Sequence, residues 1–135
     1  MPEIFPKKFI VDYVFFGRSN ASNTLELIDN KLVLCIEYGV FDTKICKKEI
    51  IPSKKEWIQF WSEMDKIGIW NWKKEYTFDS TEILADEDIS KIKIDLEDKN
   101  LDTFCWCNAP EGLGEFFDAL KKLIKIDIRN PNALN

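Results

Sequence analysis

The apolar residues of this chain repeat with two different spacings, and the order of these spacings restricts the possible folds more than any other feature. Residues 8–51 and 91–107 contain alternating or β-branched and aromatic runs, which are typical of strands. After residues 52 and 108, apolar residues recur at steps of three and four, the spacing of one helix face. The sequence therefore predicts four strands, a helix, two strands and a final helix.

Six strands are expected in total. They are Lys8–Phe16, two strands joined by a tight turn at residues 29–31, Lys44–Ile51, Lys91–Glu97 and Leu101–Cys107. The lysines of the fourth strand are typical of a sheet edge, where charge discourages pairing with other chains. In the fifth strand, Ile92 and Ile94 alternate with charged residues, so one face of the sheet is expected to face water.

Both expected helices have recognisable start signals. Ser53 and Glu56 have the spacing of a capping box, and Gly68 offers a left-handed stop. Asn108 repeats this logic for a second helix that is expected to end near Ile126. The apolar stripes are Trp57, Phe60, Trp61, Met64 and Ile67 in the first helix, and Leu113, Phe116, Phe117, Leu120, Leu123 and Ile124 in the second. Residues 69–72 are expected to be extended, and residues 77–88 to form an acidic connection.

These elements predict an α+β fold. A single antiparallel sheet of about six strands would carry both amphipathic helices on one face, because each helix has one apolar stripe. A chain of 135 residues without a linker-like segment predicts one domain over residues 1–135. Residues 129–135 are polar and are expected to fray.

Two of these segments resemble a group of small, uncharacterised bacterial proteins. The segments are Trp57–Tyr76 and Asn108–Ile124, which together cover about half of the chain. In that group a tryptophan-rich helix and strand precede a Ser-Asn-Ala-Tyr-Pro turn and a terminal helix. Here Cys107 stands at the serine position and the tyrosine is missing. The resemblance implies an α+β protein and carries no activity.

The sequence predicts a cytoplasmic protein. The first residues lack the charged and apolar regions of a secretory signal, and the longest apolar runs, such as Leu32–Ile36, are far too short to cross a membrane. Four irregularly spaced cysteines are then expected to be reduced thiols.

The absence of histidine is the main restriction on chemistry. It removes Ser-His and Cys-His nucleophiles and every metal site that contains histidine. The sequence also has no glycine-rich phosphate loop and no calcium-binding loop of the EF-hand kind. We therefore expect a protein without enzymatic activity and without a cofactor.

The negative charge of the chain is concentrated in residues 79–102. Nine acids against three lysines give this segment a charge of −6, whereas the whole chain carries −5. Within it, the candidate partner-binding residues are Asp79, Glu82, Asp86, Glu87 and Asp88, although such a run also suits a solvated loop. The leading hypothesis is a bacterial or phage binding protein that covers a partner's surface, as an immunity protein or inhibitor does. Nucleic acid is disfavoured because the lysines form only one local patch.

Two alternatives remain open. Trp70 and Trp72 would share one side of an extended segment and could contact a partner, or could pack in the core. A small molecule could occupy a pocket lined by Trp57, Trp61, Trp70, Trp72 and Trp106. The third hypothesis is a thiol or zinc protein. If a turn centres on residues 40 and 41, Cys35 faces Cys46, and we expect both on the sheet face that also holds Cys105 and Cys107.

Overall fold

The computed structural model describes residues 4–15, 21–38, 43–77, 88–106 and 108–134. It is an α+β fold with one sheet in the order β4-β3-β2-β1-β6-β7-β5. The strands are β1 (Lys8–Val14), β2 (Ala21–Ile28), β3 (Lys31–Tyr38), β4 (Thr43–Ile50), β5 (Glu75–Thr77), β6 (Ile89–Asp95) and β7 (Asn100–Trp106). The helices are α1 (Lys54–Ile67), a short 3₁₀ helix η1 (Ile69–Asn71) and α2 (Leu113–Ile124).

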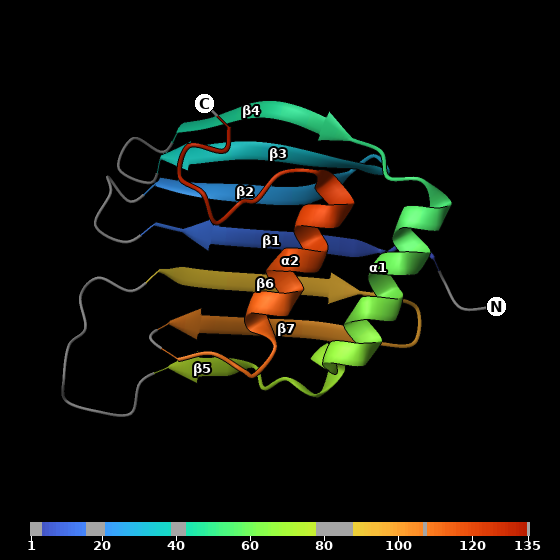
Figure 1. Cartoon of the computed structure of the whole chain (residues 1–135). Helices are drawn as coiled ribbons and strands as arrows, with labels where there is room; N and C mark the ends of the chain where they lie inside the picture. Colours follow the sequence, from blue (N-terminus) through green and yellow to red (C-terminus); the bar gives the residue numbers. More distant parts are fainter. Residues whose placement is uncertain (1–3, 16–20, 39–42, 78–87, 107, 135) are drawn as a thin grey trace.

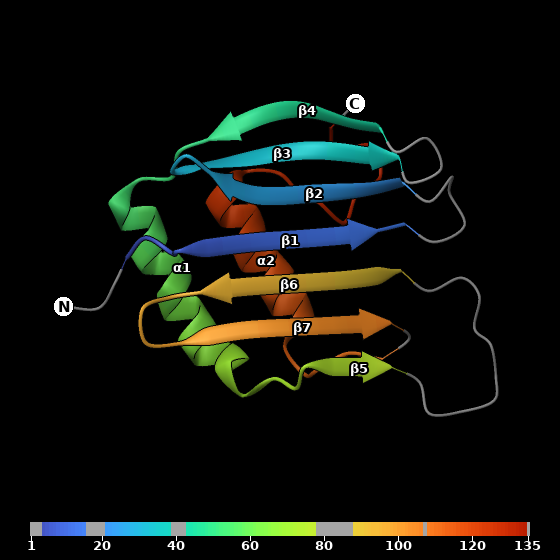
Figure 2. The ribbon, with the colours of Figure 1, turned by 180° about the vertical axis from the view of Figure 1, so that it is seen from behind.

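Helices α1 and α2 cover the same face (Figure 1), which confirms the predicted arrangement. Figure 2 shows the other face of the sheet, which no helix of the described residues covers.

The first four strands form an antiparallel meander. Ile28 pairs with Lys31, so Asp29 and Asn30 form a two-residue turn, and both have the positive φ angles that such a turn requires. Strand β4 pairs only with β3 and lies at the sheet edge, as its lysines predict. The predicted hairpin and edge strand are both confirmed.

Helix α1 begins and ends where the sequence predicts. The Ser53 hydroxyl accepts a hydrogen bond from the Glu56 amide, and the Glu56 carboxylate accepts one from the Ser53 amide. Gly68 ends the helix in the left-handed conformation. Trp57, Phe60 and Met64 are buried against the sheet.

The segment after α1 corrects two predictions. Residues 69–71 form η1 and are not extended, because the turn at Gly68 continues into another helical turn. Residues 75–77 then form β5, which runs parallel to β7. The sheet is therefore mixed and has seven strands, whereas about six antiparallel strands were predicted. A strand of three residues is too short to show an alternating pattern.

Helix α2 begins later than the sequence predicts. Asn108 does accept a hydrogen bond from the Ala109 amide, but Gly112 is the N-cap and Leu113 the first helical residue. Gly112 has a φ of 96°, and a Cβ atom built there would lie 2.6 Å from Ile67 Cγ2. Contact with the end of α1 therefore requires glycine at the start of α2. The helix ends at Ile124, close to the predicted end.

Residues after α2 lie against the sheet and do not project from it. Ile128 and Leu134 are buried, and the Asn23 side-chain amide donates hydrogen bonds to the carbonyls of Ile128 and Asn130. The described part of the segment that was expected to fray is thus held by a buried polar residue of β2. None of the described helices is long and apolar enough to span a membrane.

The core lies between the helices and two rows of apolar side chains on the sheet. One row contains Leu32, Phe9, Ile94 and Leu101, and the next contains Leu34, Leu25, Val11 and Ile92. Phe60 of α1 and Phe116 of α2 contact each other above these rows, with ring centroids 6.3 Å apart. Burial of these apolar side chains stabilises the packing of the two helices on the sheet.

Candidate functional site

The third row on the helix-covered face begins with the apolar Ile36 of β3 and is then polar across the next four strands. It contains Asn23, Tyr13, Ser90 and Cys105, which are paired across β2, β1, β6 and β7. Asn23, Ser90 and Cys105 are only 2%, 4% and 3% exposed. Buried polar groups cost free energy unless they find partners, so this row requires an explanation. Asn23 has one, since it holds the segment after α2.

The other members of this row border a cavity of about 500 Å³ between the sheet and the beginning of α2. It is lined by Tyr13, Asp88, Ser90, Cys105, Asn108, Ala109, Leu113, Gly114, Phe117 and Arg129. Its size suits a small ligand, and its lining combines apolar surface with a few polar groups, as binding pockets do.

Tyr13 and Asp88 form one polar contact of this cavity. The Tyr13 hydroxyl donates a hydrogen bond of 2.8 Å to Asp88 Oδ2. Burial raises the pKa of the Tyr13 phenol well above its usual value, and the bond to Asp88 raises it further. The phenol therefore stays protonated at neutral pH. Its ring packs edge-on against Phe117, with centroids 5.5 Å apart.

Arg129 brings a second charged group to the cavity. Its Nε and Nη2 atoms donate to both oxygens of Asp127, at 2.8 and 2.9 Å, and Nη2 also donates to Asp118 at 2.9 Å. The guanidinium carbon lies 5.6 Å from the ring centroid of Phe117. Two carboxylates thus fix the position of the Arg129 guanidinium at the cavity.

Cys105 contributes a neutral thiol. Burial raises its pKa to about 11, so the thiol is protonated at neutral pH. A protonated thiol is a weak nucleophile, which favours a role in shaping or contacting a ligand over covalent chemistry.

The predicted acidic residues fall mostly outside the described residues. Asp79, Glu82, Asp86 and Glu87 lie there, and Asp88 is the member of this set that the structure places. It lies at the cavity, which the sequence interpretation did not foresee.

The tryptophans do not line a common pocket in the structure. Trp57 is buried and stacks on Trp61, whereas Trp106 lies on the opposite face of the sheet. Trp70 contacts Trp61, and Trp72 contacts Phe116, so both pack partly into the core. The parity argument that placed Trp70 and Trp72 together fails because η1 is helical. They nevertheless border one polar groove, next to Lys74 and Asp102.

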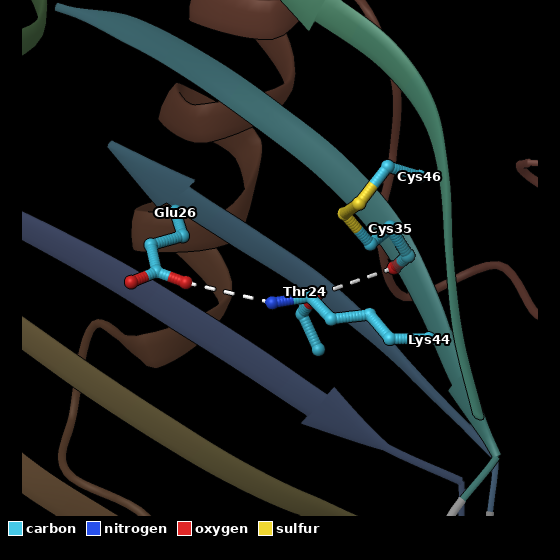
Figure 3. Close-up of a disulfide and its surroundings, with 5 residues drawn as sticks. All are labelled: Thr24, Glu26, Cys35, Lys44 and Cys46. Atoms are coloured by element: carbon cyan, nitrogen blue, oxygen red, sulfur yellow. Dashed lines mark hydrogen bonds and ion pairs between the residues drawn. A yellow bond between two sulfur atoms is a disulfide. The ribbon is translucent and has the colours of Figure 1, made fainter. Parts of the chain in front are cut away.

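The cysteine prediction is correct for one pair. Cys35 and Cys46 face each other across β3 and β4, as predicted, but they form a disulfide where reduced thiols were expected. Figure 3 shows this bond beside Thr24, whose hydroxyl donates to the Cys35 carbonyl, and beside the ion pair of Lys44 with Glu26. The bond joins the edge strand to the rest of the sheet.

Cys105 corrects the zinc hypothesis. It shares its parity with Leu101 and Thr103 and faces the helices, whereas Cys35 and Cys46 lie on the uncovered face. Cys107 lies outside the described residues. The structure thus separates Cys105 from the other two, and the described residues contain no group of three side chains that could hold a metal ion.

No protein-family model matches the chain, and no curated protein matches it in sequence. The arguments for function therefore depend on the residues of this chain alone.

A signal for this cavity was present in the sequence. In β6, Ser90 precedes Ile92 and Ile94 at the same parity, and in β1, Tyr13 follows Phe9 and Val11. The polar residue is the last of the core-facing series in β1 and the first in β6, and because the two strands are antiparallel both lie at the same end of the sheet. Such a change in several adjacent strands predicts a polar site at that end of the core.

Proposed function

We propose that this protein is a non-enzymatic binding protein and that the cavity beside α2 is its recognition site for a small polar ligand. The observation that supports the proposal is Ser90. Its side chain lines the cavity, and no hydrogen bond of its hydroxyl is found among the described residues. The hydroxyl is open to the cavity and can donate a hydrogen bond to a ligand there or accept one from it.

The protonation states of the other groups support binding over catalysis. The Tyr13 phenol and the Cys105 thiol are both neutral at pH 7, because burial raises the pKa of each. Neutral donors and acceptors on rigid strands can orient a ligand without reacting with it.

Gly114 offers a direct test of the site. It lines the cavity, and a Cβ atom built there would meet nothing within 4 Å. A leucine at this position is therefore expected to fill part of the cavity without disturbing the fold. Gly114→Ala is the matched control, since it removes the glycine but leaves the space open.

The measurement is a small-molecule screen by ¹H–¹⁵N NMR, with nucleotides and other polar metabolites as probes. Binding should move the amide signals of Ser90, Leu113 and Phe117, and these shifts should disappear in Gly114→Leu and persist in Gly114→Ala. Ligands that shift other amide signals, or that still bind to Gly114→Leu, would show that the cavity is not the binding site.

A second candidate function is protein binding of the immunity or inhibitor kind, through the acidic segment. One observation favours it. Of the acidic residues 86–88, the structure describes Asp88, which lies at the cavity and accepts a hydrogen bond from Tyr13. Acidic residues there would attract a basic partner and speed its association.

The test replaces Asp86, Glu87 and Asp88 with their amides and compares the proteins recovered with wild type and variant from the native host. A partner recognised in this way should bind the variant more weakly and with less dependence on salt. A partner that binds both proteins equally, at every salt concentration, would exclude the acidic segment as the contact.

A further inference from the structure

A groove of about 520 Å³ lies at the opposite ends of β6 and β7 from the cavity beside α2. It is lined by residues 100–102 of β7 and by Trp70 and Trp72 from the segment after α1, and we call it the β7 groove. Strand β5 pairs with residues 104–106 of β7, so no described strand covers the outer edge of β7 at this groove. The groove has the volume of a small-molecule site and shares no lining residue with the cavity.

The two tryptophans give the β7 groove an apolar surface that other contacts hold in place. Trp70 Nε1 donates a hydrogen bond of 2.9 Å to Asp65 Oδ1, and the Lys99 ammonium lies 5.6 Å from the centroid of the Trp70 ring. Trp72 packs against Phe116, with ring centroids 6.1 Å apart. Both tryptophans are half-buried. Aromatic surface that is already fixed can pack on the C–H groups of a ligand at little cost in side-chain entropy.

The hydrogen-bonding groups of the β7 groove remain available to a ligand. In the described part of the chain, neither the Trp72 indole N–H nor the Asn100 side chain forms a hydrogen bond. The indole can donate, and the Asn100 amide can both donate and accept. The carboxylates of Asp95 and Asp102 add acceptors to the same lining.

The charges of the β7 groove cancel. Lys74 and Lys93 contribute +2, and Asp95 and Asp102 contribute −2, so its described lining carries no net charge. None of these four side chains forms an ion pair with another described residue. The net charge thus favours neither an anion nor a cation. A wholly apolar ligand is also disfavoured, because it would displace water from charged groups without replacing the lost hydrogen bonds.

We propose that the β7 groove binds a saccharide. Such a ligand is uncharged, its hydroxyl groups donate and accept hydrogen bonds, and its ring C–H groups pack on tryptophan. The Asn100 amide and the Asp102 carboxylate bind the hydroxyls, and the Trp72 indole donates to a sugar oxygen. The groove is separate from the cavity, so this site does not depend on the proposed function.

The test is an NMR titration of the full chain with the disaccharides maltose, cellobiose, lactose and N,N′-diacetylchitobiose. At least one of them is expected to shift the indole signal of Trp72 and the backbone amides of Leu101 and Asp102. Asn100→Ala should weaken this binding about fivefold, the effect of losing one neutral hydrogen bond. Asn71→Ala is the matched control and should bind like wild type, because Asn71 is exposed on η1 and does not line the groove.

Two further variants test the geometry. Trp72→Phe keeps a ring beside Phe116 but removes the indole N–H, so it should also bind about fivefold more weakly. Gly114→Leu, which fills part of the cavity beside α2, should bind the disaccharide like wild type. Loss of binding in Gly114→Leu would show that the sugar occupies the cavity, and would overturn the assignment to the groove.

The remaining outcomes test the ligand class. Failure of all the disaccharides to shift the groove signals would overturn the proposal, and so would equal binding by Asn100→Ala and wild type. Glucose, glucuronate and protonated glucosamine share one ring and differ in charge. Similar binding of the three is expected, and a preference of about tenfold or more for either charged form would overturn the assignment of an uncharged ligand.

Discussion

Reduction of the Cys35–Cys46 bond should destabilise the protein by an amount that follows from its position. The two cysteines are 11 residues apart in sequence. For a loop of that length, loss of the cross-link is expected to cost about 2.8 kcal/mol at 25 °C in the chain-entropy treatment. Because unfolding entropy is about 2.1 cal/mol/K per residue near 60 °C, a chain of 135 residues should then melt about 10 °C lower.

The assay is thermal unfolding by circular dichroism, with and without dithiothreitol, after a non-reducing peptide map has located the bond. Cys46→Ser is the control, since it cannot form the bond and should melt at one temperature under both conditions. Amide hydrogen exchange should also accelerate first in β4, which pairs with a single neighbour. Oxidised and reduced wild type melting within about 2 °C of each other would refute the reasoning, because the cross-link would then not constrain the unfolded chain.

Three further changes test the packing of the helices and the burial of the cavity. Gly112→Ala should destabilise the fold by about 2 kcal/mol or more in urea unfolding, because a Cβ atom there meets Ile67 and φ is positive. Its control Gly114→Ala should be neutral or stabilising by up to about 1 kcal/mol, and a similar loss in both would contradict the contact. Ser53→Ala should cost about 1 kcal/mol through loss of the cap, whereas Ser62→Ala on the exposed side of α1 should not; equal effects would argue against the capping box. For Cys105, whose pKa is raised to about 11 from 9.0, stability should be complete below about pH 9 and fall as the pH rises toward 11. Cys105→Ser should lack this part of the alkaline loss, and an unchanged pH profile would show that the thiol does not contribute.

The parts of the fold that the sequence predicts well are those decided by neighbouring residues. The capping box of Ser53 and Glu56 and the stop at Gly68 depend on groups within one helical turn. The turn at Asp29 and Asn30 is equally local. Each of these was found because its hydrogen bonds close within a few residues.

The start of α2 is not determined by residues that are close to it in sequence. Asn108 and Pro110 have the residue types of a helix start, and Asn108 does accept a local hydrogen bond. The helix begins only after Gly112, whose position is decided by its contact with Ile67, 45 residues earlier in the sequence. No pattern within residues 108–126 contains that contact.

The prediction of which face of β7 lies toward the core was wrong for a different reason. The prediction placed Cys105 on the face away from the core, which implies that Phe104 and Trp106 face the core. Pairing with Ile92 and Ile94 instead turns Thr103 and Leu101 toward the helices. The aromatic residues therefore lie half-buried on the uncovered face. The alternation within β7 does not by itself tell which face is buried, because the register with β6 decides this.

The polar row at the end of the core separates residues that serve the fold from residues available for binding. Asn23 bonds two backbone carbonyls of the segment after α2, so its burial is explained by the fold itself. Ser90, two strands away in the same row, has no such bond among the described residues and faces the cavity. If the row existed only to seal the core, an apolar residue at position 90 would be the more stable choice, as Ile92 and Ile94 are in the neighbouring rows. A hydroxyl that is open to the cavity at that position is the pattern expected where binding and folding place different demands on one residue.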